Sequence, residues 1–158
     1  MRLVLDSLAA LMLCGILAGV VLQTRSERRL EDKIELARAE VERFQSQILL
    51  QAALEKGQLS QRGYPKTVEV EWFAGSTPAN PLLGPSHPWV EIADESQRDL
   101  LHPHNRMAFD AQAAQFWYSP YTGVVRARVP SDVSDVTALR LYNRVNGTNL
   151  ASLYGPAE

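Results

Sequence analysis

The sequence has little cysteine, no block of charge of one sign, and no internal repeat or low-complexity segment. Its single cysteine, Cys14, lies within an apolar stretch near the start, so the polar remainder of the chain carries no disulfide and no thiol site. Acidic and basic side chains are interspersed, and the formal net charge is −2. Because no basic patch is present, we expect no nucleic-acid partner.

Motifs for catalysis and for metal binding are also missing. No G-x-S-x-G or other nucleophile motif occurs. His102 and His104 have no cysteine or third histidine close in sequence, so we interpret this segment as a surface loop and not as a metal site. The ligand spacing of a calcium loop is lacking among the aspartates of the C-terminal part, Asp94, Asp99, Asp132 and Asp135. We therefore predict a non-enzymatic chain with no catalytic residue, no cofactor and no metal.

The longest apolar run covers residues 3–22, which are apolar except for Asp6, Ser7 and the glycines. At about 1.5 Å per residue, a helix of this length spans roughly 30 Å, the thickness of the hydrocarbon core of a bilayer. No small-x-small cleavage site follows and the helical pattern continues, so we expect an uncleaved membrane helix over residues 1–24. An acid at membrane depth is costly, which makes Asp6 a candidate functional residue, with Arg2 or the α-amine as its partner. The alternative is that Asp6 reaches the membrane interface alone.

Residues 25–58 predict an amphipathic helix that continues the membrane helix. Apolar side chains at alternating spacings of four and three form one stripe. Its larger members are Leu30, Ile34, Val41, Phe44 and Ile48. No proline or glycine interrupts the segment before Gly57, which suits a helix C-cap. Two uses of the stripe remain open: a coiled coil with another chain, or packing on a sheet of the same chain, which we favour because a sheet follows.

Residues 59–158 predict a small antiparallel-sheet head domain. Alternating apolar and polar residues indicate strands at 67–72 and 89–93, separated by a proline-rich loop over residues 76–88. The strongest hairpin signal joins residues 115–119 to 124–129 through Pro120-Tyr121-Thr122-Gly123, a β-turn sequence with glycine where a positive φ is wanted.

The alternation of side chains across a sheet sets the faces of this hairpin. Phe116 and Tyr118 should share one face and Trp117 should take the other, and one of these faces should cover the helix stripe. The three tryptophans, Trp72, Trp89 and Trp117, are interpreted as core or sheet-face residues.

The chain ends with a short predicted helix. Ser131 or Ser134 suits its N-cap, and Gly147 suits its end. The side chains expected on one face are Val136, Leu139, Tyr142 and Val145. The predicted fold class is α+β: a long N-terminal helix, half membrane-spanning and half amphipathic, packed on a small antiparallel sheet, with a short C-terminal helix.

Three segments resemble type IV pilins and the pseudopilins of type II secretion systems. Residues 14–19, C-G-I-L-A-G, are similar to the I-G-I-L-A-A core of the N-terminal segment in that family. Residues 63–65, G-Y-P, resemble the turn that follows the family's long helix. Residues 116–125, F-W-Y-S-P-Y-T-G-V-V, resemble its W-x-Y-D-P-x-T-G-x-V hairpin. Residues 66–114 contribute nothing to the resemblance.

The resemblance implies a role in assembly for two residues near the N-terminus. Aligning the glycines places Asp6 on the acidic residue that is fifth in mature pilins, and Arg2 on the first mature residue, where the family has phenylalanine. In pilin-like filaments this acid is thought to neutralise the N-terminal amine of a neighbouring subunit. A carboxylate within an apolar core is tolerable only beside a close cation, so the implied role is physically reasonable.

The expected function is therefore that of a structural subunit of a bacterial envelope filament or secretion assembly. Its expected partners are the lipid bilayer, other pilin-like subunits or secretion-system membrane proteins, and further copies of itself. Counting positive charges beside the apolar run favours a cytoplasmic head, whereas the resemblance implies a head on the periplasmic side of the inner membrane, which we adopt. The alternative is a single-pass, membrane-anchored coiled-coil scaffold or adaptor whose head domain binds a protein.

Overall fold

The computed structural model describes the backbone of residues 2–155 and the side chains of residues 22–155. The chain divides into two compact units, Met1–Lys33 and Ile34–Glu158, and the first helix, α1 (Arg2–Ala53), contributes to both. The side chains of residues 2–21, including those of Arg2 and Asp6, lie outside the described residues. Within the part of the chain whose side chains are described, no helix has an apolar stretch long enough to cross a membrane.

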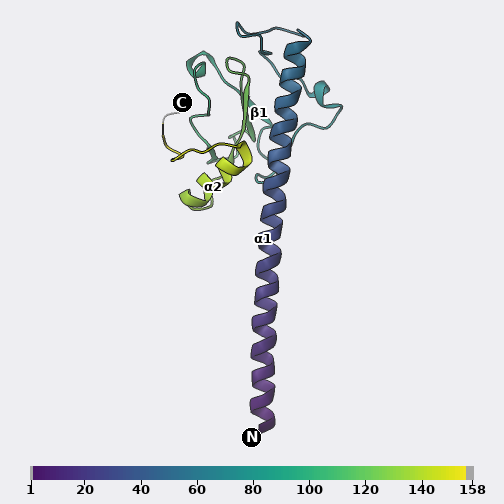
Figure 1. Cartoon of the computed structure of the whole chain (residues 1–158), viewed down its shortest axis with the longest axis vertical. Helices are drawn as coiled ribbons and strands as arrows, with labels where there is room; N and C mark the ends of the chain where they lie inside the picture. The colour runs from purple at the N-terminus through teal and green to yellow at the C-terminus, as the bar shows by residue number, and fades with distance from the viewer. Residues whose placement is uncertain (1, 156–158) are drawn as a thin grey trace. The chain divides into compact units, whose positions relative to one another are not determined.

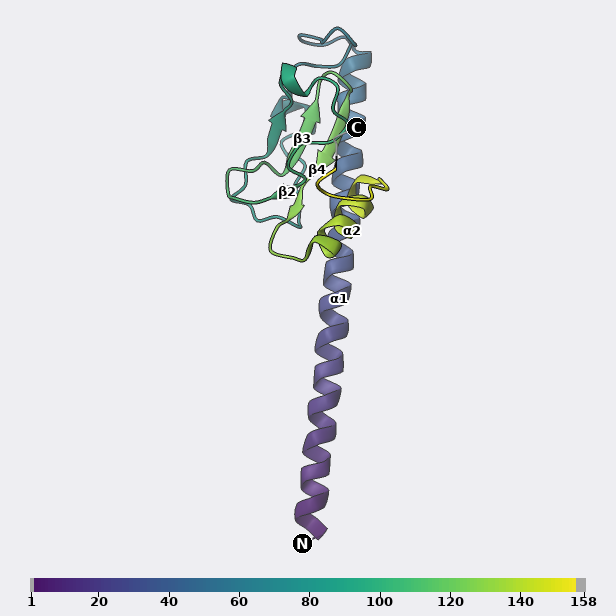
Figure 2. The same ribbon diagram turned by 90° about the vertical axis from the view of Figure 1, so that its left-hand side faces the viewer.

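The second unit is an α+β domain in which a small mixed sheet and a short helix pack on the C-terminal part of α1 (Figures 1 and 2). After α1 the elements follow in the order η1 (Val70–Phe73), β1 (Val90–Ile92), η2 (Glu95–Gln97), β2 (Met107–Ala108), β3 (Phe116–Ser119), β4 (Val124–Ala127), β5 (Val129–Pro130) and α2 (Asp135–Asn146).

Helix α1 ends in a motif that the sequence did not predict. The Lys56 backbone N–H donates to Gln51 O at 3.3 Å and the Glu55 N–H donates to Ala52 O at 3.1 Å. These two bonds form a Schellman motif, in which the C′ residue adopts the left-handed conformation. That residue is Glu55, with φ of 51°. The prediction that Gly57 caps the helix is therefore wrong, because α1 ends at Ala53 and Glu55 takes the C′ position.

The sheet is mixed, which corrects the prediction of an antiparallel sheet. β3 pairs antiparallel with β4, but β1 pairs parallel with β3, and the order is β1-β3-β4. A second, two-stranded sheet joins β2 and β5, also in parallel. The turn sequence at 120–123 dictates only the hairpin pair, whereas the long connection between β1 and β3 leaves room for the parallel return.

The predicted hairpin is confirmed. Phe116 lies opposite Ala127 and Tyr118 lies opposite Val125, and Gly123 has φ of +72°, the left-handed conformation that the turn requires. The predicted second strand of the hairpin is shorter than expected. It breaks at Arg128, after which β5 joins β2 instead.

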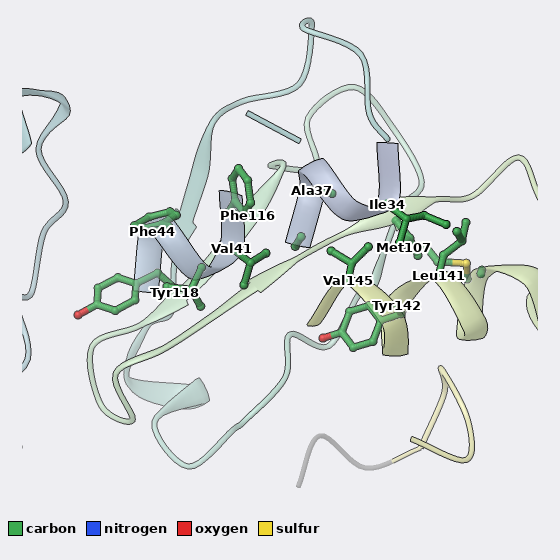
Figure 3. Close-up of a cluster of buried hydrophobic side chains, with 14 of the residues drawn as sticks. Ile34, Ala37, Val41, Phe44, Met107, Phe116, Tyr118, Leu141, Tyr142 and Val145 are labelled. Atoms are coloured by element: carbon green, nitrogen blue, oxygen red, sulfur yellow. The ribbon is translucent and has the colours of Figure 1, made fainter. Parts of the chain in front are cut away.

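The core lies between α1 and one face of the sheet (Figure 3). The Phe44 ring is central: it stacks on Trp89 with ring centroids 5.5 Å apart and meets Phe116 at 5.7 Å and Tyr118 at 6.4 Å. Phe116 and Tyr118 thus share the face that covers the helix stripe, as predicted. Burial of each such large side chain stabilises the fold by about 1.5–3 kcal/mol.

The stripe on α1 is buried from Ile34 to Ile48. Its buried members are Ile34, Ala37, Val41, Phe44 and Ile48. Leu30, which the spacing included, is 39% exposed and belongs to the other compact unit, so it is not part of this core.

The strand predicted over residues 67–72 is not formed. In its place η1 makes a single 3-10 turn, followed by Ala74 in the left-handed region. The turn directs Phe73 into the core, where its ring meets Phe44 edge-on at 5.5 Å, while Val70 stays exposed. The alternating sequence at 67–72 is therefore misleading, because Phe73, just beyond it, supplies the buried contact.

Helix α2 begins and ends as predicted. The Ser134 side chain accepts a hydrogen bond from the Thr137 N–H, and Gly147 follows the last turn in the left-handed conformation. The buried face differs in part from the prediction, because Val136 is exposed whereas Ala138 and Leu141 are buried with Tyr142 and Val145. The buried face is displaced from Val136, since Ala138, Leu141, Tyr142 and Val145 are the residues that share the core with β4 and β5.

Candidate functional site

The two head segments that resemble the pilin family contact each other, although fifty residues separate them in the sequence. The Tyr118 hydroxyl donates a buried hydrogen bond of 2.8 Å to the Pro65 carbonyl. The Tyr64 ring lies against Gly123 so closely that a Cβ at position 123 would stand 2.4 Å from Tyr64 Cε1. Gly123 is therefore required twice, by its positive φ and by the tyrosine ring packed on it.

An amide from each helix caps the outer edge of β4. The Gln45 side chain on α1 donates to Gly123 O at 2.6 Å and accepts from Val125 N at 3.0 Å. The Asn146 side chain on α2 accepts from Ala127 N at 2.7 Å and donates to Ala127 O at 3.0 Å. These amides occupy the backbone groups that an added strand would use, so the β4 edge is closed to strand exchange.

The opposite face of the sheet carries a polar row. Glu91, Trp117 and Arg126 lie side by side on the three strands, with their side chains directed away from α1. Trp117 is fully buried, and its indole N–H donates to Gln97 Oε1 at 3.2 Å. Residues of the connection between β1 and β2 thus cover this face.

Arg128, buried at the break between β4 and β5, binds this face to the loops around it. Its guanidinium donates to the carbonyls of Asn105 at 2.8 Å and Ala114 at 2.9 Å. It also pairs with the Glu91 carboxylate at 2.6 Å. A buried cation is tolerable only with such partners, so Arg128 fixes the geometry of the surrounding chain.

His102 is buried, which corrects the prediction that residues 102–104 form a surface loop. Its side chain is only 5% exposed, and Nδ1 lies 3.0 Å from the Tyr142 hydroxyl. Burial, and then the nearby positive charges of Arg126 and Arg106, lower the pKa of His102 to about 4. The imidazole is therefore neutral at physiological pH. His104, two residues on, is exposed.

Two of the aspartates considered as calcium ligands, Asp94 and Asp135, accept hydrogen bonds from other side chains of the domain. Asp94 accepts from the Ser96 hydroxyl at 2.6 Å and from the Ser96 N–H at 2.8 Å, and the hydroxyl contact is the main cause of a lowered Asp94 pKa. Asp135 accepts from the Tyr154 hydroxyl at 3.0 Å. Among the described residues, no group of three or more histidine, cysteine and acidic side chains is placed to hold a metal ion.

Sequence reasoning missed the polar residues that hold these segments together. Gln45, Asn146 and Arg128 each sit beside apolar neighbours in the sequence, and no motif there predicts the contacts that they make. The sequence shows only that each of these polar residues stands next to a buried position. This does not identify the group to which its side chain bonds. Asp6 and Arg2, the predicted assembly residues, lie outside the residues whose side chains are described.

Comparisons with protein-family models, with curated proteins and with solved structures find no match to this chain.

Proposed function

We propose that this chain is a non-enzymatic, pilin- or pseudopilin-like structural subunit of a bacterial envelope filament or secretion assembly. Residues 1–24 would anchor it in the inner membrane, and the domain that begins within α1 would stand on the periplasmic side. The observation that carries the proposal is the contact of Gly63–Pro65 with the 120–123 turn, at the base of a sheet packed on the long helix.

This contact supports the proposal because the resemblance was drawn from each segment separately. A chance match of two short motifs gives no reason for them to meet. Here Tyr64 packs on Gly123, and the hydroxyl of Tyr118 reaches Pro65 O. The glycine, the tyrosines and the proline are therefore parts of one structural unit, which holds the end of the hairpin to the chain that leaves α1.

The burial of the α1 stripe argues against the alternative, a coiled-coil scaffold. A coiled coil would need the side chains of Ile34, Val41, Phe44 and Ile48 to face another chain. These side chains are between 0% and 7% exposed because the sheet and α2 of the same chain cover them. Association through this stripe would require the domain to open.

Contact between subunits within the membrane would fall to the N-terminal segment, where Asp6 is the proposed contact residue. A carboxylate in an apolar environment needs a close cation, and the α-amine or Arg2 of a neighbouring subunit would supply it. Since that cation would belong to another chain, Asp6 would contribute to assembly and not to folding.

The test is replacement of Asp6 in the full chain, expressed in a bacterium that carries a type II secretion or pilus system. Asp6→Ala should leave the protein in the membrane with a protease-resistant head, because loss of a charge makes insertion easier. Cross-linking through cysteines introduced in the membrane segment, and co-purification with pilin-like subunits, should be lost. Asp6→Glu should restore both, and Asp6→Asn should restore little.

Asp32→Ala is the matched control, because Asp32 is an exposed acid on α1 beyond the apolar run. This variant should assemble as the unchanged chain does. Normal assembly of Asp6→Ala would show that the charge at this position is not needed and would overturn the proposal.

A further inference from the structure

A pocket of about 420 Å³ opens between the loop after α1 and the turn of the β3–β4 hairpin. The residues that give it chemical character are Leu59, Arg62, Lys66, Glu95, Arg98 and Tyr121. Three of these side chains are cationic and one is anionic. The pocket is therefore positive on a chain whose formal net charge is −2, and its volume lies in the range of pockets that bind ligands.

One wall of the pocket is a closed loop with a fixed backbone. Lys66 N donates to Gln58 O at 2.8 Å and Ser60 N donates to Tyr64 O at 2.7 Å. The Ser60 hydroxyl accepts from the N–H groups of Arg62 and Tyr64, both at 3.3 Å. Tyr64, held against Gly123, ties this loop to the opposite wall. The two walls are thus set before any ligand arrives.

The opposite wall neutralises its own acid. The Glu95 carboxylate accepts from the Tyr121 hydroxyl at 3.0 Å and pairs with Arg98 at 2.9 Å, and the Arg98 guanidinium lies 6.0 Å from the centre of the Tyr121 ring. No ion pair of the Arg62 or Lys66 side chain is found among the described residues. The pocket therefore presents two cations that its own carboxylate does not satisfy.

We propose that this pocket binds an acidic segment of a partner protein, with a carboxylate between Arg62 and Lys66 and an apolar side chain against Leu59 and Tyr121. An arginine fork binds a carboxylate through two parallel hydrogen bonds, and the Leu59 and Tyr121 surfaces favour a peptide over a free ion. The inference rests on the proposed function, because a structural subunit must meet other proteins of its assembly through its head.

The experiment is calorimetric titration of the full chain in detergent with an acetylated, amidated hexapeptide of glutamate and phenylalanine. The control peptide has glutamine at each glutamate position. We expect the acidic peptide to bind and the glutamine peptide to bind at least tenfold more weakly, with the difference falling as salt is raised. The double variant Arg62→Gln/Lys66→Gln should lose about tenfold in affinity.

Two further variants separate this site from a general effect of charge. Arg38→Gln/Arg140→Gln removes two exposed arginines that do not line the pocket and should leave affinity unchanged. Glu95→Gln removes the competing carboxylate but keeps an acceptor for Tyr121, and should raise affinity by about threefold. Equal binding of both peptides, or equal loss in both double variants, would overturn the proposal. Inorganic phosphate binding as tightly as the peptide would overturn the assignment to a protein segment.

Failure here is distinguishable from failure of the proposed function. Asp6→Ala should bind the peptide normally, since Asp6 is not among the pocket residues. If Asp6→Ala loses assembly and the unchanged chain does not bind the peptide, the proposed function stands and only the pocket is ruled out.

Discussion

The two faces of the β1–β3–β4 sheet are built on different principles. The face toward α1 is apolar and aromatic, with Phe116 and Tyr118 around Phe44. The other face carries Glu91, Trp117 and Arg126 in register, with Arg128 and His102 buried nearby. The apolar face is held by area removed from water, which any side chain of suitable shape supplies. The polar face depends on particular partners, because each buried charge or hydrogen-bonding group must find one.

This difference decides how each face responds to change. Loss of volume on the apolar face should cost stability in proportion to the cavity left, at any pH. On the polar face a change of protonation should by itself lower stability, because a charged histidine buried near arginines is unfavourable. The following variants test these responses, from the largest expected effect to the smallest.

Phe44→Ala should give the largest loss. The ring is fully buried and contacts Trp89, Phe73, Phe116 and Tyr118, so its removal should lower the free energy of unfolding by about 3–5 kcal/mol. Urea unfolding of the full chain, followed by tryptophan fluorescence, measures it. Leu49→Ala is the control on the same helix: Leu49 is 51% exposed, and its loss should cost no more than about 0.5 kcal/mol. Equal losses in the two variants would show that the stripe is not the core.

Gly123→Ala tests the turn that both faces share. A methyl group at this position would meet the Tyr64 ring while the backbone keeps a positive φ, so we expect a loss of about 2–4 kcal/mol. Tyr64→Ala in the same chain should recover part of it, because the clash is removed and the backbone strain remains. A double-mutant cycle on the free energy of unfolding measures the recovery. Strictly additive losses would contradict the contact between the two motifs.

His102 should make the polar face sensitive to acid. Its pKa is about 4 in the fold and about 6.5 when the chain is unfolded, so the unfolded state binds the extra proton between these values. The contribution of His102 to the free energy of unfolding should therefore be fully present above about pH 6.5. It should fall by up to about 3 kcal/mol as the pH drops to about 4. His102→Leu should flatten this part of the pH profile. The exposed neighbour is the control: His104→Gln should leave the profile unchanged, and a profile that follows His104 would refute the assignment.

Glu55→Gly should have the smallest effect and lies outside both faces. Glu55 holds the left-handed C′ position of α1, where glycine avoids the Cβ clash but gains freedom in the unfolded chain. The balance should raise the free energy of unfolding by about 0.5 kcal/mol. Glu55→Gln, with a Cβ and no charge, should leave it unchanged. A stabilisation equal to that of Glu55→Gly would assign the gain to charge instead of conformation.

The contrast between the faces also sets how far the sequence predicted the structure. The stripe on α1, the hairpin and the caps of α2 depend on local spacing or on turn chemistry, and these features are present. The parallel pairing of β1 and the 3-10 turn at η1 depend on contacts remote in sequence. The local sequence pattern therefore predicted neither of them. The burial of His102 was not predicted for the same reason, because no neighbouring residue in the sequence indicates its contact with Tyr142.

The measurement that most directly tests the account is whether the head lies on the periplasmic side of the inner membrane, as proposed. A structural subunit of the envelope needs its head outside the inner membrane, whereas counting Arg2 against Arg25, Arg28, Arg29 and Lys33 favours the cytoplasm. A phosphatase that is active only in the periplasm and a fluorescent protein that is dark there, each fused to the C-terminus of the full chain, give opposite signals. The account predicts an active phosphatase and no fluorescence, and a fluorescent fusion with an inactive phosphatase would contradict it.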